Sequence, residues 1–226
     1  MIMKKYIQIA FIALGMFLVS CENVEEKAKS FRIDFEEAIN QDSISNAEKI
    51  VATSKVYYDG LSESQKQEFD KIAPSFSAIL TAKKLNMTFI KLCGTHFLLL
   101  EEKDIQKCID LHTKSQAYRK TLRGKDVKAF DNEVIDFKGK IIEARAYKKG
   151  YEWGLAIDSE KTDSARIIAT EINNTLRTLS PKYQEVFKQR VKSAKLLIVK
   201  QLQIFLKNGL ISEKEYEVRK NRILNN

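Results

Sequence analysis

Residues 180–209 read SPKYQEVFKQRVKSAKLLIVKQLQIFLKNG, and this stretch carries the plainest helical pattern of the chain. Ser180 can cap a helix, and Pro181 suits the first turn, where its missing amide hydrogen costs no hydrogen bond. Gly209 can adopt the left-handed conformation that ends many helices. The stretch therefore predicts one long helix that begins at Pro181 and runs to Asn208.

The rest of the chain shows the same helical spacing of apolar residues. Only 8 Gly and 2 Pro are present, a composition that favours helices over strands and turns. Ser62 and Gln65 form a capping-box pattern, and residues 76–100, apolar on most faces, predict a central buried helix. We expect an all-α, multi-helix bundle that ends in a small two-helix hairpin. The expected helical segments are 24–38, 47–61, 62–73, 76–100, 104–122, 127–144 and 165–179, and the longest expected connection is 150–159.

The N-terminus has the pattern of a secretory signal. Lys4 and Lys5 are followed by an uncharged, largely apolar run, residues 6–19, and then by Leu18-Val19-Ser20-Cys21. The run has about 14 residues, fewer than the roughly 20 that a membrane-spanning helix needs. Leu18-Val19-Ser20-Cys21 resembles the lipobox of bacterial lipoproteins. An ordinary secretory signal with a chance cysteine is the alternative interpretation.

The lipobox resemblance implies a covalent lipid rather than a bound cofactor. It implies cleavage before Cys21, a diacylglycerol on the Cys21 sulfur, and acylation of the new amine, for example by palmitate. Two or more acyl chains anchor a protein stably where one chain is marginal. Glu22 is not the aspartate that commonly marks inner-membrane retention, so we expect the outer membrane, with the protein on the periplasmic side or the cell surface. The acidic stretch 22–26 also resembles surface-export tags of some lipoproteins.

The length after the signal allows one sizeable core. We divide the chain into a signal peptide at 1–20, a helical bundle domain at 21–200 and a C-terminal hairpin at 201–226. The net charge is +9, and the basic excess lies in the second half. This excess could attract anionic lipid headgroups or acidic envelope polymers, or could simply be a solvated face. Export makes nucleic acid an unfavourable candidate partner.

The C-terminus carries the second distinctive motif. Residues 201–224 read QLQIFLKNGLISEKEYEVRKNRIL. This stretch resembles the SHOCT module, a short C-terminal domain of many bacterial proteins, at about 202–224. The residues that hold the matching places are Gly209, Ile211, Ser212, Glu215, Tyr216, Lys220 and Leu224, whereas Val218 stands where the family often has a small residue.

The resemblance implies a role in oligomerisation or partner binding and implies no catalytic residue. Ser212 and Glu215 are spaced to cap each other's helix start. The short helix that follows should fold back on the end of the long one, with its apolar side inward. The candidate partner-binding residues are Leu202, Phe205, Leu206, Gly209, Ile211, Tyr216 and Leu224.

Two cysteines and both histidines lie within 20 residues of one another. Cys93 and His96 are three apart, and Cys108 and His112 are four apart, so each pair shares a helix face. A turn near Glu102 would bring the two pairs together, where they could hold zinc. Oxidation could instead join Cys93 to Cys108 in a disulfide, or both could be buried free thiols beside two ordinary histidines.

No enzyme motif is found in the sequence: it contains no Gly-rich phosphate loop, no HExxH and no GxSxG. The aromatic residues Tyr147, Tyr151 and Trp153 could line a ligand patch or simply pack the end of a bundle. We therefore expect a non-enzymatic, membrane-anchored envelope lipoprotein that mediates protein–protein interaction or oligomerisation. The alternatives are an immunity or inhibitor lipoprotein that neutralises an envelope toxin or hydrolase, and a helical envelope enzyme.

Overall fold

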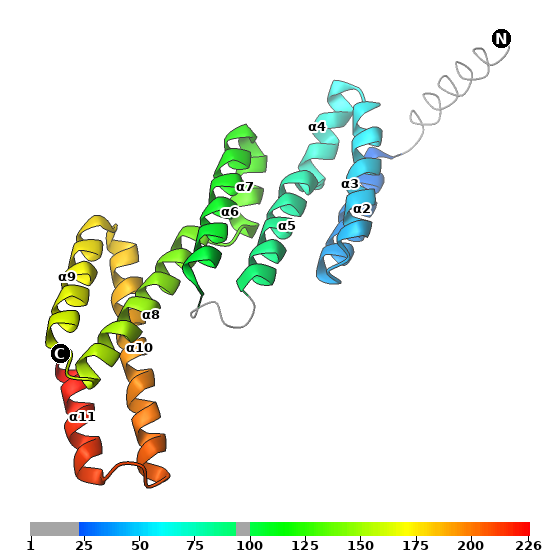
Figure 1. Ribbon diagram of the computed structural model, residues 1–226. Helices are drawn as coiled ribbons and strands as arrows, with labels where there is room; N and C mark the ends of the chain where they lie inside the picture. The colour runs from blue at the N-terminus through cyan, green and yellow to red at the C-terminus, as the bar shows by residue number, and fades with distance from the viewer. Residues whose placement is uncertain (1–22, 94–99) are drawn as a thin grey trace, which may run out of the picture. The chain divides into compact units, whose positions relative to one another are not determined.

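The computed structural model describes residues 23–93 and 100–226, and this part of the chain is an all-α multi-helix bundle without strands (Figure 1). Cys21 and the rest of the lipobox lie outside these residues, as does His96. The helices are α2 (Val24–Asn40), α3 (Ile44–Asp59), α4 (Glu63–Ile72), α5 (Phe76–Cys93), α6 (Glu102–Thr121), α7 (Gly124–Glu133), α8 (Phe137–Asp158), α9 (Thr162–Thr178), α10 (Pro181–Lys207) and α11 (Glu213–Asn225).

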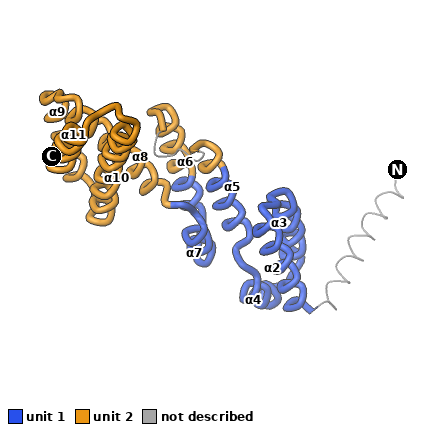
Figure 2. The backbone as a smooth tube through the Cα atoms, turned by 90° about the horizontal axis from the view of Figure 1, so that it is seen from below, with its two compact units in different colours: residues 1–87, 115–135 blue, residues 88–114, 136–226 orange. Residues whose placement is uncertain are grey.

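The chain forms two compact units (Figure 2). Unit 1 contains residues 1–87 and 115–135, and unit 2 contains residues 88–114 and 136–226. The division falls within α5 and within α6, and the expected boundary between residues 200 and 201 lies inside α10. The C-terminal hairpin is therefore part of unit 2.

The first part of unit 1 consists of the helices α2, α3 and α4, which pack around an aromatic core. Asn23 caps α2 through its side-chain oxygen, and Ser62 and Gln65 make the predicted capping box at the start of α4. The rings of Phe35 and Phe76 pack in a tilted arrangement, with their centroids 4.8 Å apart. The buried apolar side chains of α2 thus hold α3, α4 and the start of α5 against one another.

The other part of unit 1 is built around α7. Phe130 of α7 is fully buried among Ala78 and Ala82 of α5. The guanidinium of Arg119 makes two 2.7 Å hydrogen bonds to the carboxylate of Asp131, which ties α6 to α7. This pair is partly exposed, so it fixes the helices' register more than it adds stability.

Unit 2 is organised around α8 and α10, which share the most extensive helix–helix contact of the described residues. The predicted long helix is confirmed, since α10 begins at Pro181 and ends at Lys207, with Asn208 as its C-cap. α9 packs on α8 around Ile172 and Phe187, and α11 packs on both α8 and α10 around Ile223.

The expected connection at residues 150–159 is wrong, because residues 150–158 continue α8. Two glycines in this stretch suggested a loop, but they serve close packing instead. A Cβ placed on Gly150 would lie 2.6 Å from the carbonyl oxygen and 2.7 Å from the Cα of Val191. Gly150 therefore lets the α8 backbone approach the α10 backbone more closely than any side chain would allow.

Two other expectations need correction. The stripe at 127–144 is split, since α7 ends at Glu133 and α8 begins at Phe137, with the Asp136 carboxylate capping the amide of Gly139. The expected buried helix at 76–100 is α5, which ends at Cys93 and leaves Ile90 59% exposed. Among the described helices, none is long and apolar enough to span a membrane.

The glycine contact gives a first prediction. Replacing Gly150 with Ala should destabilise unit 2 by about 1–3 kcal/mol, because the new methyl group meets backbone atoms of α10 that cannot move alone. The matched control is Gly154→Ala, one turn later, whose methyl group meets only the flexible end of the Ile198 side chain. Its cost should stay below about 1 kcal/mol, because alanine also favours the helix.

Urea unfolding followed by the fluorescence of Trp153, the sole tryptophan, measures the stability of both variants. Equal stability of the two variants would contradict the assigned role of Gly150.

Candidate functional site

The C-terminal hairpin is the first candidate site, and its turn follows the sequence prediction. Gly209 has a φ of +70°, in the left-handed region that glycine adopts without strain. Ser212 caps α11 by accepting a 3.2 Å hydrogen bond from the amide of Glu215. The carboxylate of Glu215 pairs with Arg219 instead of returning to Ser212, so half of the predicted reciprocal cap forms.

The inner side of α11 is docked on unit 2. Ile223 is fully buried and packs with Ile157 of α8 and with Ile198 and Leu202 of α10. Leu202 is itself only 1% exposed, so it belongs to this core and offers no surface to a partner. The hairpin therefore has a fixed conformation before any partner binds.

A partly buried ion pair fixes the same helix. The guanidinium of Arg219 donates hydrogen bonds of 2.9 and 2.7 Å to the two carboxylate oxygens of Asp158. Asp158 ends α8, where the helix dipole disfavours a negative charge, so the cation opposite it is needed. The hydrogen bond that Arg219 donates to Asp158 also raises the pKa of Arg219. This pair joins residues 61 positions apart, and sequence spacing gave no sign of it.

The outer side of the hairpin remains accessible at its turn. Ile204, Phe205 and Leu210 are 55%, 41% and 67% exposed, and we call this set the hairpin tip. Phe205 was a sequence-predicted partner residue, whereas Ile204 and Leu210 were not. Their position on either side of the Gly209 turn was the signal that could have identified them.

The other predicted partner residues differ in their exposure. Leu224 is 41% exposed near the end of α11, and Leu206, Ile211 and Tyr216 are half-buried. Ile211 and Tyr216 pack against the Ile223 core. Leu224 is as exposed as Phe205, and Val218 of α11 is 50% exposed, so a partner could reach apolar side chains along α11 as well as at the hairpin tip.

The cysteine pair is the second candidate site. The Sγ atoms of Cys93 and Cys108 lie 3.5 Å apart and both residues are buried free thiols in the structure. Burial raises the pKa of Cys93 to about 12, and burial also raises the pKa of Cys108. A disulfide would need the sulfurs to approach by about 1.5 Å. Both the thiol and the disulfide interpretations of the sequence fit this separation.

The zinc hypothesis places four ligands together, and the structure describes three of them. His112 is half-buried one turn after Cys108 on α6. In residues 23–93 and 100–226, no three His, Cys, Asp or Glu side chains are grouped closely enough to hold a metal ion. His96 lies outside these residues.

The basic face of α10 is partly neutralised by carboxylates of unit 2. Arg190 pairs with Glu143 at 2.6 Å, and Lys182 pairs with Asp136 at 3.0 Å. These carboxylates come from residues 46 and 47 positions earlier in the chain, so the sequence near α10 did not reveal them. The aromatic residues of α8 also pack inward: Tyr147 is buried, and Tyr151 and Trp153 border the core.

Comparisons of the chain with protein-family models, with curated proteins and with solved structures find no match. Among the described residues, the candidate sites are an apolar hairpin tip, a buried thiol pair and the basic face of α10.

The ion pair beneath the hairpin gives a second prediction. Arg219→Ala should leave Asp158, whose side chain is 10% exposed, without its partner and weaken the docking of α11 by about 2 kcal/mol. Hydrogen exchange in residues 213–225 should then accelerate roughly 30-fold. Arg222→Ala is the matched control, because its partner Glu160 is 71% exposed, and the loss should be below about 1 kcal/mol. Equal acceleration in both variants would show that Arg219 does not anchor the hairpin.

The thiol pair gives a third prediction. In the reduced native protein at pH 8, a Cys93 pKa of about 12 leaves about one thiolate in ten thousand. Iodoacetamide should therefore modify Cys93 slowly, and both buried cysteines should react at the ordinary rate after unfolding in guanidinium. Peptide mapping of Cys93 and Cys108, with and without prior reduction, measures the rates and reveals a disulfide if one is present. Rapid native modification of Cys93 would contradict the burial of the pair.

Proposed function

We propose that this chain is a bacterial envelope lipoprotein, anchored in the outer membrane by a lipid on Cys21, that acts without catalysis by binding a second copy of itself through the hairpin tip. The observation that carries the proposal is the tip itself: three large apolar side chains are exposed on a rigidly docked turn.

The anchor half of the proposal is supported by the N-terminal pattern. Lys4 and Lys5, an apolar run and Leu18-Val19-Ser20-Cys21 follow one another in the order that lipoprotein precursors have. A lipid at Cys21 would hold every copy in one plane of the envelope. This raises the effective concentration of copies for one another, so that a small contact suffices for association.

The contact half is supported by the preorganisation of the hairpin. Arg219 and Ile223 fix α11 against α8 and α10, so a partner would not have to order the turn when it binds. Exposed apolar side chains gathered at one place commonly mark protein–protein contacts. The resemblance of residues 202–224 to the SHOCT module points in the same direction.

The test is cross-linking in intact cells, and it gives a fourth prediction. The double variant Phe205→Ser, Leu210→Ser should lose a cross-linked product that contains two copies of the chain, without loss of folding, because both side chains are largely exposed. Ile167→Ser is the matched control, since Ile167 is 60% exposed on α9 of the same unit, and it should cross-link normally.

Each half of the proposal can fail separately. A double variant that still cross-links to itself would overturn the role of the tip, and a product that contains a different protein would overturn self-association. Cys21→Ser should abolish incorporation of labelled palmitate and release the protein from the membrane. Incorporation of palmitate into this variant would overturn the anchor.

A further inference from the structure

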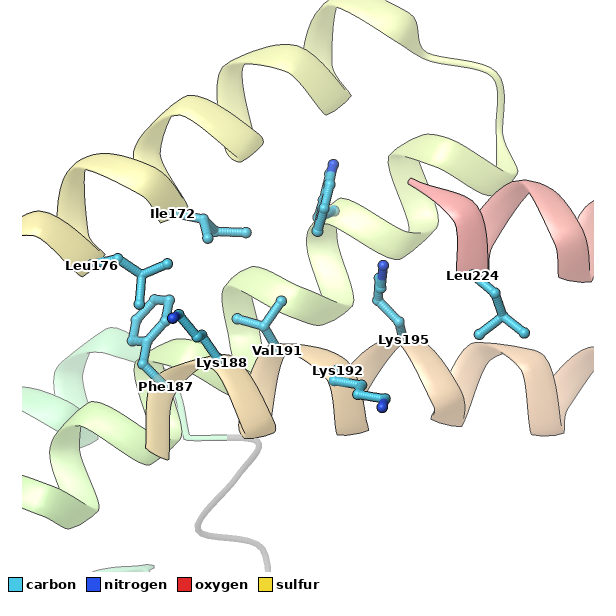
Figure 3. Close-up of a pocket in the computed structure, with 9 residues that line it drawn as sticks. Ile172, Leu176, Phe187, Lys188, Val191, Lys192, Lys195 and Leu224 are labelled. Atoms are coloured by element: carbon cyan, nitrogen blue, oxygen red, sulfur yellow. The ribbon is translucent and has the colours of Figure 1, made fainter. Parts of the chain in front are cut away.

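A groove in unit 2 combines an apolar wall with the ammonium group of a largely buried lysine. It has a volume of about 290 Å³ and is formed by α8, α9, α10 and α11. Ile172 and Leu176 of α9 and Leu224 of α11 line it together with Trp153 of α8 (Figure 3). This groove is separate from the hairpin tip and from the cysteine pair.

Lys195 enters the groove from α10 (Figure 3). It is 9% exposed and is the sole Lys or Arg classed as buried among the described residues. Its aliphatic stem passes Gly154, where an added Cβ would lie 3.6 Å from the Lys195 Cγ atom. Its Nζ lies 4.6 Å from the centroid of the Trp153 ring, in a cation–π contact.

No described carboxylate lies within 4.0 Å of the Lys195 ammonium, and no hydrogen bond from it is found within the described chain. Arg190 and Arg219 of unit 2, by contrast, pair with Glu143 and Asp158. Burial lowers the pKa of Lys195, and no neighbouring charge opposes this effect. The folded protein therefore removes part of the water around this lysine and offers its ammonium group only an aromatic ring in return.

An unpaired buried cation has little value for stability. A neutral side chain of similar length, such as methionine, would fill the same space without the desolvation cost. Polar groups that lower the stability of the fold and lack a partner within it are typical of functional sites, where a bound ligand supplies the missing partner. The Lys195 ammonium thus points to an anion that would occupy the groove.

The rest of the groove specifies what kind of anion fits. The apolar side chains can cover a hydrocarbon chain or a ring, and Lys188 and Lys192, both exposed, place positive charge at the rim. The one lysine of the groove that is largely buried, Lys195, matches a ligand with a single negative charge. A volume of about 290 Å³ is at the lower end for small-molecule sites, which suits one short chain rather than a lipid with two.

We propose that this groove binds a small amphipathic carboxylate, such as a medium-chain fatty acid, with its apolar body against Trp153 and Ile172 and its carboxylate on Lys195. The carboxylate would accept a charge-assisted hydrogen bond from Nζ and complete the pairing that the protein lacks. Its contact with the single tryptophan makes binding directly observable.

The experiment titrates decanoate, below the concentration at which it forms micelles, into the full chain held in neutral phosphatidylcholine vesicles. Trp153 fluorescence should change and saturate, whereas decanol, which has the same chain and no charge, should produce no saturable change. Lys195→Met should weaken decanoate binding about tenfold or more, because a charge-assisted hydrogen bond is lost. Acetate should not bind, since it lacks the apolar body.

Matched variants separate ligand binding from folding. Lys200→Met removes an exposed lysine of the same helix that lies outside the groove, and it should bind decanoate as the unmodified chain does. Thermal unfolding of Lys195→Met should show a stability equal to or higher than that of the unmodified chain, because the desolvation cost disappears. Three results would overturn the proposal: equal responses to decanol and decanoate, undiminished binding by Lys195→Met, or marked destabilisation by Lys195→Met, which would make Lys195 a structural residue.

Discussion

The close approach of α8 and α10 at Gly150 is the contact on which the rest of unit 2 depends. At this point the two backbones meet without an intervening side chain, and Gly154 repeats the opening one turn later. The close approach allows many van der Waals contacts between α8 and α10, and each of them contributes a small dispersion energy. α9 then packs on the α8–α10 pair through Ile172, and α11 packs on it through Ile223.

The same approach creates both surfaces of unit 2 that we propose for binding. At the end of α8 it places Asp158 opposite Arg219, which docks α11 and makes the hairpin tip rigid. At Gly154 it leaves room for the end of the Ile198 side chain, and the nearby Lys195 ammonium lies over the Trp153 ring. The hairpin contact and the groove are thus two results of one packing geometry, although they face different kinds of partner.

The sequence predicted the helices whose ends carry their own local signals. α10 lies within one residue of its predicted span, because Ser180, Pro181 and Gly209 act on neighbouring residues only. The error at 150–159 has the opposite cause. A glycine in a helical pattern can end a helix or allow close packing, and the partner that decides is Val191, some 40 residues away. Local pattern alone could not separate these two roles.

The candidate sites differ in the same way: some of their features depend on neighbouring residues in the sequence, and others depend on residues far along the chain. The Gly209 turn and the Ser212 cap were visible in the sequence, so the position of the hairpin was predictable. The basic face of α10 was also visible, but its lysines looked equivalent. The fold distinguishes them, since Asp136 neutralises Lys182 at the surface while Lys195 is buried beside an aromatic ring. A count of charges measures how basic a helix is, whereas the packing of α8 on α10 determines which of its lysines is largely buried.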